Sequence, residues 1–450
     1  MMPFLAFLRA QWAQSVSRHG LRRIVLLLGC GLLLFWLTAS HILMEGLSGY
    51  YPNAVLFFRP YYPSAVQTIA EEQLRSALER AAKEQGSAPG AKGAGASPAS
   101  SQSSDLGRLR EQLAGALANE PLNARTVRQL GQAAELQGDA KGAQRLMRMA
   151  ARLSLTESVA VDWMMRKSFF GGDHRAAVYY ADALLRSHSE LVPYAAPALG
   201  QLAETKTGRD VLVKFLATEP PWRNTFLRLI ASNVADARTP FEIFMALKDT
   251  PAPPQQSELR AYVEFLTGHE FFDLAYFTWL QFLPPEQLAN MGFLFNGGFE
   301  QALSGFPFDW TIGRGTGVTV DIAPRLDAQD KRGLLVSFGA GRASFPRVYQ
   351  WAALPPGDFR FKGLLKGELI ARRGLQWSVH CHGGQTIGES EMFLGRRQEW
   401  TNFEFAFTVP TTGCAPEIVI LTHASRSPSE QMASGAIWFD DLTIVRAPEN

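Results

Sequence analysis

Two of the three cysteines, with the residues around one of them, carry the most distinctive chemistry of this sequence. Cys381 ends an alternating segment that begins at Leu375. Cys414 lies just before 417–423, the second expected strand after that segment. In an oxidising compartment these thiols would pair, and loop entropy predicts roughly 3 kcal/mol of stabilisation. Metal binding by His380, Cys381 and His382 is the alternative, but neighbours along a strand point to opposite faces. We therefore predict a disulfide between Cys381 and Cys414.

Sequence motifs of the large enzyme classes are absent. There is no nucleophile elbow, phosphate loop, zinc signature or redox Cys-x-x-Cys. Gly313, Gly315 and Gly317 form a Gly-x-Gly-x-Gly run, but no helix follows this turn-rich stretch, so we interpret it as a loop. Carboxylates far apart in the sequence could still meet in the fold as an acid and a base. We predict no catalytic residues and keep an enzyme as the alternative.

Composition excludes one class of partner. Lys plus Arg number 44 and Asp plus Glu number 42, which gives a net charge of +2. No long basic run occurs, so the sequence has no electrostatic footprint for nucleic acid. With 46% hydrophobic residues in 450, the chain can form two or three domains with true cores.

One segment near the N-terminus is apolar enough to cross a membrane. Residues 24–44 contain no acidic or basic side chain apart from His41, and 21 helical residues match a hydrocarbon core of about 30 Å. Arginines precede the segment and Glu45 follows it. The positive-inside bias therefore predicts a cytoplasmic N-terminus (1–23), a transmembrane helix (24–44) and the bulk of the chain in the periplasm, anchored in a bacterial inner membrane.

Two other interpretations of the anchor stay open. The small residues Thr38, Ala39 and Ser40 could be a signal-peptidase site, although the long lead and the apolar continuation favour an uncleaved anchor. Cys30 follows Leu-Leu-Gly and faintly resembles a lipoprotein processing box. The strongly apolar run after it is atypical of such a box, so we interpret Cys30 as a small residue of the spanning helix.

The region after the anchor is predicted to hold a juxtamembrane segment (45–84) and a linker (85–104). Residues 50–63 are aromatic and interrupted by proline, and we expect them near the bilayer surface, followed by a short helix over 64–83. Residues 85–104 have no aromatic side chain and no aliphatic one larger than Ala. Such a stretch cannot offset its chain entropy by burial, so we expect a flexible linker with a reach of roughly 25 Å.

A repeat of 34 residues marks the next region, predicted as a helical repeat domain over 105–290. Gly138-Asp139 recurs as Gly172-Asp173, and Ala143 recurs as Ala177. Small residues at fixed offsets let two antiparallel helices approach, and Gly-Asp supplies the turn between them. The pattern resembles tetratricopeptide repeats, degenerating after the second unit. Such repeats stack into a concave surface that commonly binds proteins, although apolar stripes are more often simply core.

At Phe293 the period changes to that of strands. Short alternating segments are separated by Gly and Pro, with no helical spacing between them, which predicts an antiparallel β-sandwich over 293–447. Phe403, Phe405, Phe407 and Val409 share one face of their segment, as a half-buried strand requires. The expected strands are 334–338, 347–353, 358–365, 375–381, 400–409, 417–423 and 436–445. The fold class is thus multidomain α + β: spanning helix, helical solenoid and jelly-roll sandwich.

Several motifs give the sandwich a family resemblance. Asn-Gly-Gly-Phe-Glu at 296–300, Leu-Pro-Pro-Gly-Asp-Phe at 354–359, Trp400 and Trp-Phe-Asp-Asp-Leu at 438–442 resemble the galactose-binding-like jelly roll of carbohydrate-binding modules. The whole chain looks like the membrane-anchored repeat proteins encoded with bacterial exopolysaccharide synthesis and export machinery. The phrases that carry this second resemblance are Glu-Pro-Leu-Asn at 120–123, Asp-Ala-Leu-Leu-Arg at 182–186, Pro-Trp-Arg at 221–223 and Pro-Phe-Asp-Trp at 307–310.

The resemblance implies two ligands. Such modules often hold a structural calcium between an acidic residue after the first strand and an Asp in the last, here Glu300 and Asp440, although a hydrogen-bonded or exposed pair explains both equally well. Sugar binding needs surface aromatic rings beside polar groups, and Arg347, Tyr349 and Trp351 share one strand face. Burial is the competing fate of Tyr349 and Trp351. Trp310, Trp377, Trp400 and Trp438 are predicted to lie in the core.

The functional hypothesis is a non-catalytic envelope scaffold in polysaccharide assembly. The repeats would hold other envelope or polysaccharide-assembly proteins while the sandwich contacts polymer; no cofactor is expected beyond a possible structural calcium. A carbohydrate-active enzyme, hydrolase or lyase, with the sandwich as accessory module is the competing hypothesis. A purely structural envelope spacer, which would bind neither glycan nor protein, is the third.

Overall fold

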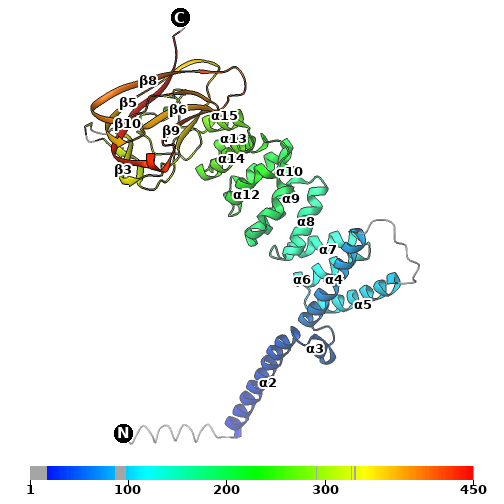
Figure 1. Cartoon of the computed structure of the whole chain (residues 1–450). Coiled ribbons are helices and arrows are strands. Elements are labelled where there is room, and N and C mark those ends of the chain that lie inside the picture. The colour runs from blue at the N-terminus through cyan, green and yellow to red at the C-terminus, as the bar shows by residue number, and fades with distance from the viewer. Residues whose placement is uncertain (1–17, 87–97, 290, 326, 329–330, 449–450) are drawn as a thin grey trace, which may run out of the picture. The chain divides into compact units, whose positions relative to one another are not determined.

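The computed structural model describes residues 18–86, 98–289, 291–325, 327–328 and 331–448. By contacts the chain divides into two compact units, residues 1–191 and residues 192–450, and each is described by itself. The first unit is helical, and the second begins with helices and ends in a β-sandwich (Figure 1). The predicted class, helices followed by an antiparallel sandwich, is confirmed.

The first unit opens with the apolar helix. Helix α2 (Arg18–Ser48) contains Val25–Ser48, which is long and apolar enough to cross a membrane, or to act as a signal sequence, and its most apolar stretch is fully exposed. Helix α4 (Pro63–Gly86) and helix α5 (Pro98–Asn119) extend into both ends of the predicted linker, and its centre, residues 87–97, lies outside the described residues. The remaining helices are α3 (Pro52–Phe58), α6 (Ala124–Leu136), α7 (Ala140–Leu153), α8 (Ser158–Phe170) and α9 (His174–Ser187), before the short turn η1 (Ser189–Leu191).

Helices α6 to α9 show the predicted period directly. The first residues of α6 and α8 are 34 positions apart, and so are those of α7 and α9. Gly138 and Gly172 adopt positive φ at the two turns, and the following Asp139 and Asp173 cap the next helix by accepting from backbone N–H groups. That these pairs are tetratricopeptide repeats stays a prediction.

The second unit continues with seven helices that are shorter and less regular. A fully buried ion pair joins two of them: both nitrogens Nε and Nη2 of Arg223 donate to the Glu258 carboxylate at 3.0 Å. Arg223 also donates to the backbone carbonyls of Leu216, Ala252 and Pro253, so its charge is well satisfied. The helices are α10 (Val192–Glu204), α11 (Lys206–Leu216), α12 (Arg223–Leu229), α13 (Thr239–Lys248), α14 (Gln256–Gly268), α15 (Phe272–Gln281) and α16 (Pro285–Ala289), with η2 (Ile230–Asn233).

The sandwich consists of two five-stranded antiparallel sheets. Sheet A has the order β1-β4-β9-β6-β7, and sheet B has the order β2-β3-β10-β5-β8. All seven expected strands are present, and the short strands β1, β2 and β7 were not expected. The bounds are β1 (Thr311–Ile312), β2 (Val318–Pro324), β3 (Arg332–Arg342), β4 (Val348–Ala352), β5 (Gly357–Ala371), β6 (Leu375–Cys381), β7 (Thr386–Glu389), β8 (Gly395–Val409), β9 (Glu417–His423) and β10 (Met432–Arg446), with η3 (Pro428–Gln431).

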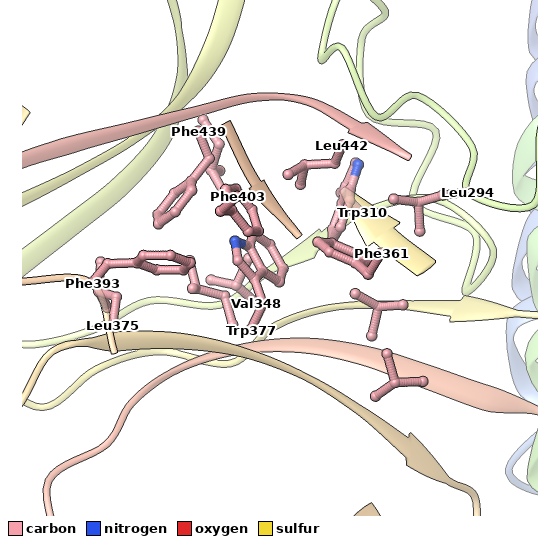
Figure 2. Packing of buried hydrophobic residues seen from close by; sticks show 14 of the residues in the cluster. Leu294, Trp310, Val348, Phe361, Leu375, Trp377, Phe393, Phe403, Phe439 and Leu442 are labelled. Carbon is pink, nitrogen blue, oxygen red and sulfur yellow. The ribbon is translucent and has the colours of Figure 1, made fainter. Parts of the chain in front are cut away.

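Aromatic side chains fill the space between the two sheets. Trp310 and Trp377 pack edge to face at 5.6 Å, and Trp377 also contacts Phe361 and Phe439 of the opposite sheet (Figure 2). Trp310 and Trp377 are therefore core residues, as predicted. The prediction is wrong for Trp400 and Trp438, which are half-buried on the outer side of sheet B.

Candidate functional site

The outer face of sheet A presents a groove at strands β4 and β9. Residue alternation places Tyr349 and Trp351 of β4 on this face, opposite Ile420 and Ile418 of β9. The cavity volume is about 530 Å³, within the range of small-ligand sites. Its lining residues, here called the β4–β9 groove, are Phe345, Pro346, Arg347, Tyr349, Trp351, His382, Ile418, Ile420, Leu421, Thr422 and His423.

The three sequence-predicted sugar-binding residues all line this groove. Arg347 is exposed, and Tyr349 and Trp351 are half-buried, so neither ring is in the core. Among the described residues, the guanidinium of Arg347 and the hydroxyl of Tyr349 have no hydrogen-bond partner. These two groups are therefore free to bond a ligand.

A helix residue packs against the ring of Trp351. Phe272, at the start of α15, packs edge to face on Trp351 with ring centroids 5.5 Å apart. The His382 ring lies 4.6 Å from the Phe272 ring and 6.0 Å from the Trp351 ring, so Phe272 packs against two of the residues that line the groove. Sequence reasoning missed Phe272 because nothing local links it to a strand 79 positions further along the chain.

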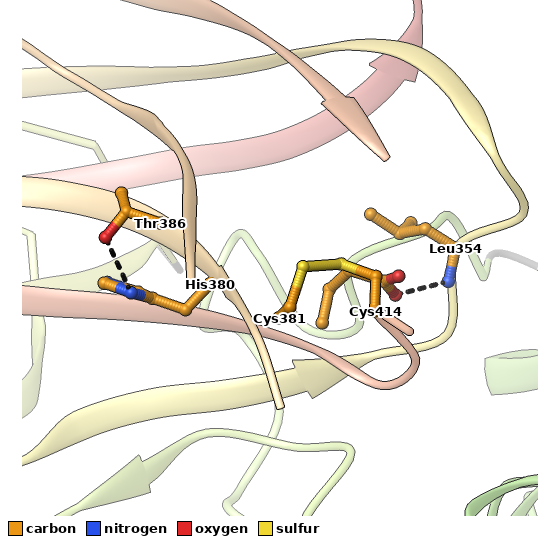
Figure 3. The surroundings of a disulfide bond; sticks show 6 residues. Leu354, His380, Cys381, Thr386 and Cys414 are labelled. Atoms are coloured by element: carbon orange, nitrogen blue, oxygen red, sulfur yellow. Dashed lines mark hydrogen bonds between the residues drawn. A yellow bond between two sulfur atoms is a disulfide. The ribbon is translucent and has the colours of Figure 1, made fainter. Parts of the chain in front are cut away.

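Polar side chains continue the same face beyond β9. In the register of β9 and β6, Ile420 is opposite Ser378 and Ile418 is opposite His380. The His380 imidazole shares a hydrogen bond with the Ser378 hydroxyl at 2.7 Å. It shares a second with the Thr386 hydroxyl at 3.1 Å (Figure 3). The face thus changes from aromatic and aliphatic at β4 and β9 to hydroxyl and imidazole at β6 and β7.

The disulfide lies at the end of β6, next to the groove. Cys381 and Cys414 are bonded, with a Cα–Cα separation of 4.4 Å, as predicted (Figure 3). The backbone N–H of His382 donates to the Cys414 carbonyl at 3.2 Å, so the bond and this contact together hold the groove residue His382. His380 faces the hydroxyls on the outer side while Cys381 is buried in the core, which excludes a His-Cys-His metal site here.

Two buried polar side chains support the inner side of β4 and β9. Gln350 donates to the Phe295 carbonyl at 2.9 Å and accepts from the Phe295 N–H at 3.1 Å. Glu417 accepts from the Leu354 N–H at 2.9 Å through Oε2, whereas its buried Oε1 has no partner among the described residues. Burial raises the pKa of the Glu417 carboxyl group, and the Leu354 hydrogen bond opposes that shift only in part.

The two predicted calcium ligands are each paired with a cation of the chain. Asp440 is buried and accepts from Arg325 through Oδ2, while Glu300 lies 3.4 Å from the Lys331 ammonium. Within the described ranges no three His, Cys, Asp or Glu side chains gather as a metal site would require. Calcium binding at Glu300 and Asp440 stays a prediction.

A second hollow lies among the helices of the same unit. It has a volume of about 840 Å³ and carries the carboxylates of Asp236, Glu270 and Asp273 beside Phe271 and Phe277. Asp236 accepts from the Arg238 N–H at 2.8 Å and so caps the start of a turn. In the described part of the chain these three carboxylates form no metal-binding cluster.

Comparisons with known proteins return solved structures that match about a third of this chain. No family model matches the sequence, and no curated protein matches it. A protein described as sugar-binding from Bacteroides thetaiotaomicron is 10% identical, with 35% of this chain covering 100% of that one at a TM-score of 0.27. A family 22 xylan-binding domain from Paenibacillus barcinonensis is 16% identical. The match covers 34% of this chain and 94% of that domain, at a TM-score of 0.24.

A third solved structure is a family 61 carbohydrate-binding module in complex with β-1,4-galactotriose. It is 21% identical, with 35% of this chain covering 100% of that module at a TM-score of 0.25. At these TM-scores the similarities carry no argument about the ligand of this chain.

Proposed function

We propose that this chain is a non-catalytic, membrane-anchored binding protein of the bacterial envelope, and that its sandwich binds a polysaccharide in the β4–β9 groove. The observation that carries the proposal is the combination of an aromatic ring and two isoleucines with donors that have no partner among the described residues. An apolar ring covers the C–H face of a pyranose, and free donors next to it bond the hydroxyls or a carboxylate.

The charge of the groove narrows the class of sugar. Its lining residues include one arginine and two histidines and no carboxylate. A neutral or anionic polymer therefore meets no repulsion, and a uronic acid would gain a charge-assisted hydrogen bond from Arg347. A cationic glycan such as a deacetylated amino sugar polymer is disfavoured.

The wider role that we propose is assembly or export of exopolysaccharide. The helical pairs α6–α7 and α8–α9 would hold partner proteins of the envelope, and the apolar helix α2 would keep the chain at the inner membrane with its bulk in the periplasm. The disulfide supports an oxidising compartment for the sandwich. Crosslinking in membranes, followed by identification of the captured proteins, tests the partner role.

Binding of the purified chain to a panel of neutral and uronate-containing oligosaccharides tests the groove. We expect Tyr349→Ala to weaken binding about tenfold, the loss of a central aromatic contact worth about 1.4 kcal/mol, and Tyr349→Phe to weaken it less because the ring remains. Val445→Ala, an exposed position on sheet B, is the control. Equal affinities for Tyr349→Ala and the control, or no binding by the unsubstituted chain, would overturn the proposal.

The same panel separates the competing functions. Release of reducing ends or unsaturated sugars from a bound polymer would identify an enzyme. A chain that binds no glycan and captures no protein would be an envelope spacer.

A further inference from the structure

The end of helix α2 is built into a packed corner with α3 and α4. The Glu45 carboxylate accepts from the Tyr62 hydroxyl at 3.1 Å and from the Ser64 hydroxyl at 2.8 Å. In the same turns, Met44 and Leu47 pack against a small core of Val55, Tyr62 and Ala65. The last turns of α2 are therefore part of the fold of the first unit.

The outer side of this corner exposes large aromatic rings. Tyr50 is 84% exposed, Tyr51 65%, Phe57 83% and Phe58 71%. The short helix α3 buries Val55 on its inner side, and the Phe57 and Phe58 rings contact each other at 5.4 Å on the outside. Leaving four such side chains within nine residues exposed to water is unfavourable. We therefore expect another apolar surface to cover this patch.

The position of the patch along the chain identifies the occupant. Val25–Ser48 is 24 residues long, which is about 36 Å of helix against a hydrocarbon core of about 30 Å. If α2 spans the bilayer, Tyr50 follows it at the level of the lipid head groups. Tyrosine is enriched at that level, and phenylalanine on short amphipathic segments inserts there, because an apolar ring and a polar edge are both accommodated.

We propose that Tyr50, Tyr51, Phe57 and Phe58, here called the aromatic corner, insert into the outer interface of the bilayer. The corner makes a second membrane contact beside the spanning helix, and the Glu45 hydrogen bonds join both contacts to α4. The first unit is then held at the membrane surface by a packed joint. This inference is independent of polysaccharide binding.

Spin labels on the full chain in vesicles test the aromatic corner. In a Cys30→Ser background the remaining cysteines are joined in the disulfide, so a single introduced cysteine can be labelled. The test variant is Phe57→Cys. The matched control is Phe170→Cys at the end of α8, because Phe170 is 82% exposed and Phe57 83%. The vesicles contain phosphatidylethanolamine and phosphatidylglycerol.

The expected result is a label at position 57 that collides with oxygen dissolved in the lipid and is shielded from a water-soluble nickel chelate, with the opposite behaviour at position 170. Equal nickel accessibility at both positions would overturn the proposal. A label at position 57 shielded from both reagents would also overturn it, because a protein surface would then cover the corner. Intact mass showing that α2 has been removed would do the same. Tyr50→Cys repeats the test on the other side of α3.

Discussion

The two outer faces of the sandwich share the same strand alternation but carry different side chains: one is aromatic and aliphatic, and the other carries paired charges. On sheet A the outward residues of β4 and β9 form an aromatic and aliphatic groove whose donors have no partner in the described chain. On sheet B the outward charges neutralise one another: Glu404 pairs with Arg360 at 3.1 Å and with Lys362 at 3.6 Å. Unpaired polar groups therefore distinguish the proposed binding face from the opposite outer face better than exposed rings do.

One tryptophan on each face makes this contrast specific. On sheet B, the Arg325 guanidinium covers the Trp400 ring at 4.0 Å, and Trp400 Nε1 donates to Asp327. Hydrogen bonds from Lys366, Arg325 and Trp400 hold the pKa of Asp327 well below its ordinary value, so this carboxylate stays ionised. On sheet A, the Trp351 ring packs against the rings of Phe272 and His382 and lines the groove. A half-exposed tryptophan is thus a structural residue in one place and a candidate ligand contact in the other.

Removal of Arg325 should be the most damaging change on the charged face. Arg325→Ala leaves the buried Asp440 carboxylate without its guanidinium, and we expect a loss of about 3 kcal/mol or more in the free energy of unfolding. Denaturant titration measures the loss. The Arg325→Ala, Asp440→Asn double variant should recover part of it. A loss below about 1 kcal/mol would show that water already solvates Asp440.

The ion pair between Arg325 and Asp440 also bears on calcium binding. Because Arg325 already neutralises Asp440, we expect Ca²⁺ or a chelator to leave the melting temperature of the unsubstituted chain unchanged. A rise of several degrees with Ca²⁺, together with calcium in the purified protein, would instead support the predicted site at Glu300 and Asp440.

Loss of the disulfide should weaken the groove sheet by a similar amount. Cys381 and Cys414 are 33 positions apart, and Cys414→Ser should lower the free energy of unfolding by about 3 kcal/mol through loop entropy. Glycan affinity should fall with it, because His382 follows Cys381. Cys30→Ser is the matched control, with no change expected in the sandwich. The same unfolding midpoint with and without reductant would contradict this prediction.

Truncation of Trp400 tests the contrast between the two faces directly. Trp400→Ala removes a cation–π contact and a hydrogen bond to a charged group, so we expect a loss of about 1–2 kcal/mol in stability. Glycan affinity should stay unchanged, opposite to the result expected for Tyr349→Ala. A parallel loss of affinity would place the binding face on sheet B.

Substitution of Glu417 should have the smallest effect on the free energy of unfolding, and this effect should depend on pH. Its pKa is raised in the folded chain, so the stability that it contributes is complete below the pKa of the unfolded carboxyl group. That contribution is lost as the pH rises through the folded pKa. Glu417→Gln cannot ionise and should therefore be more stable than the unsubstituted chain at pH 8, on the order of 1 kcal/mol, with a smaller difference at pH 4. Urea titrations at the two pH values measure it; a difference that grows on acidification would contradict the raised pKa.

The strands of the sandwich were largely predictable because alternation is a local signal. The set Phe403, Phe405 and Phe407 lies on the inner side of β8, as its spacing indicated. The error on Trp400 was avoidable, since Trp400 has the same parity as Asn402 and Glu404, which point outward. Trp438 likewise alternates with the buried Ile437 and Phe439.

The site itself was predictable only in part. Tyr349 and Trp351 were found because one strand shows them together, and the alternation of β9 also contained a signal for Ile418 and Ile420. The cover of Trp351 by Phe272 and the pairing of Arg325 with Asp440 join residues 79 and 115 positions apart. Such contacts depend on the packing of elements and leave no periodic trace in the sequence.

The side-chain amide of Gln350 forms the same pair of hydrogen bonds that a backbone residue forms in a β-ladder. Its amide exchanges both hydrogen bonds with the backbone of Phe295, as a neighbouring strand would. Strand β4 therefore cannot slide lengthwise without breaking these bonds at the same moment as those to β9. A polymer that pulls on Tyr349 along the strand would therefore have to break the bonds to Phe295 and those to β9 together.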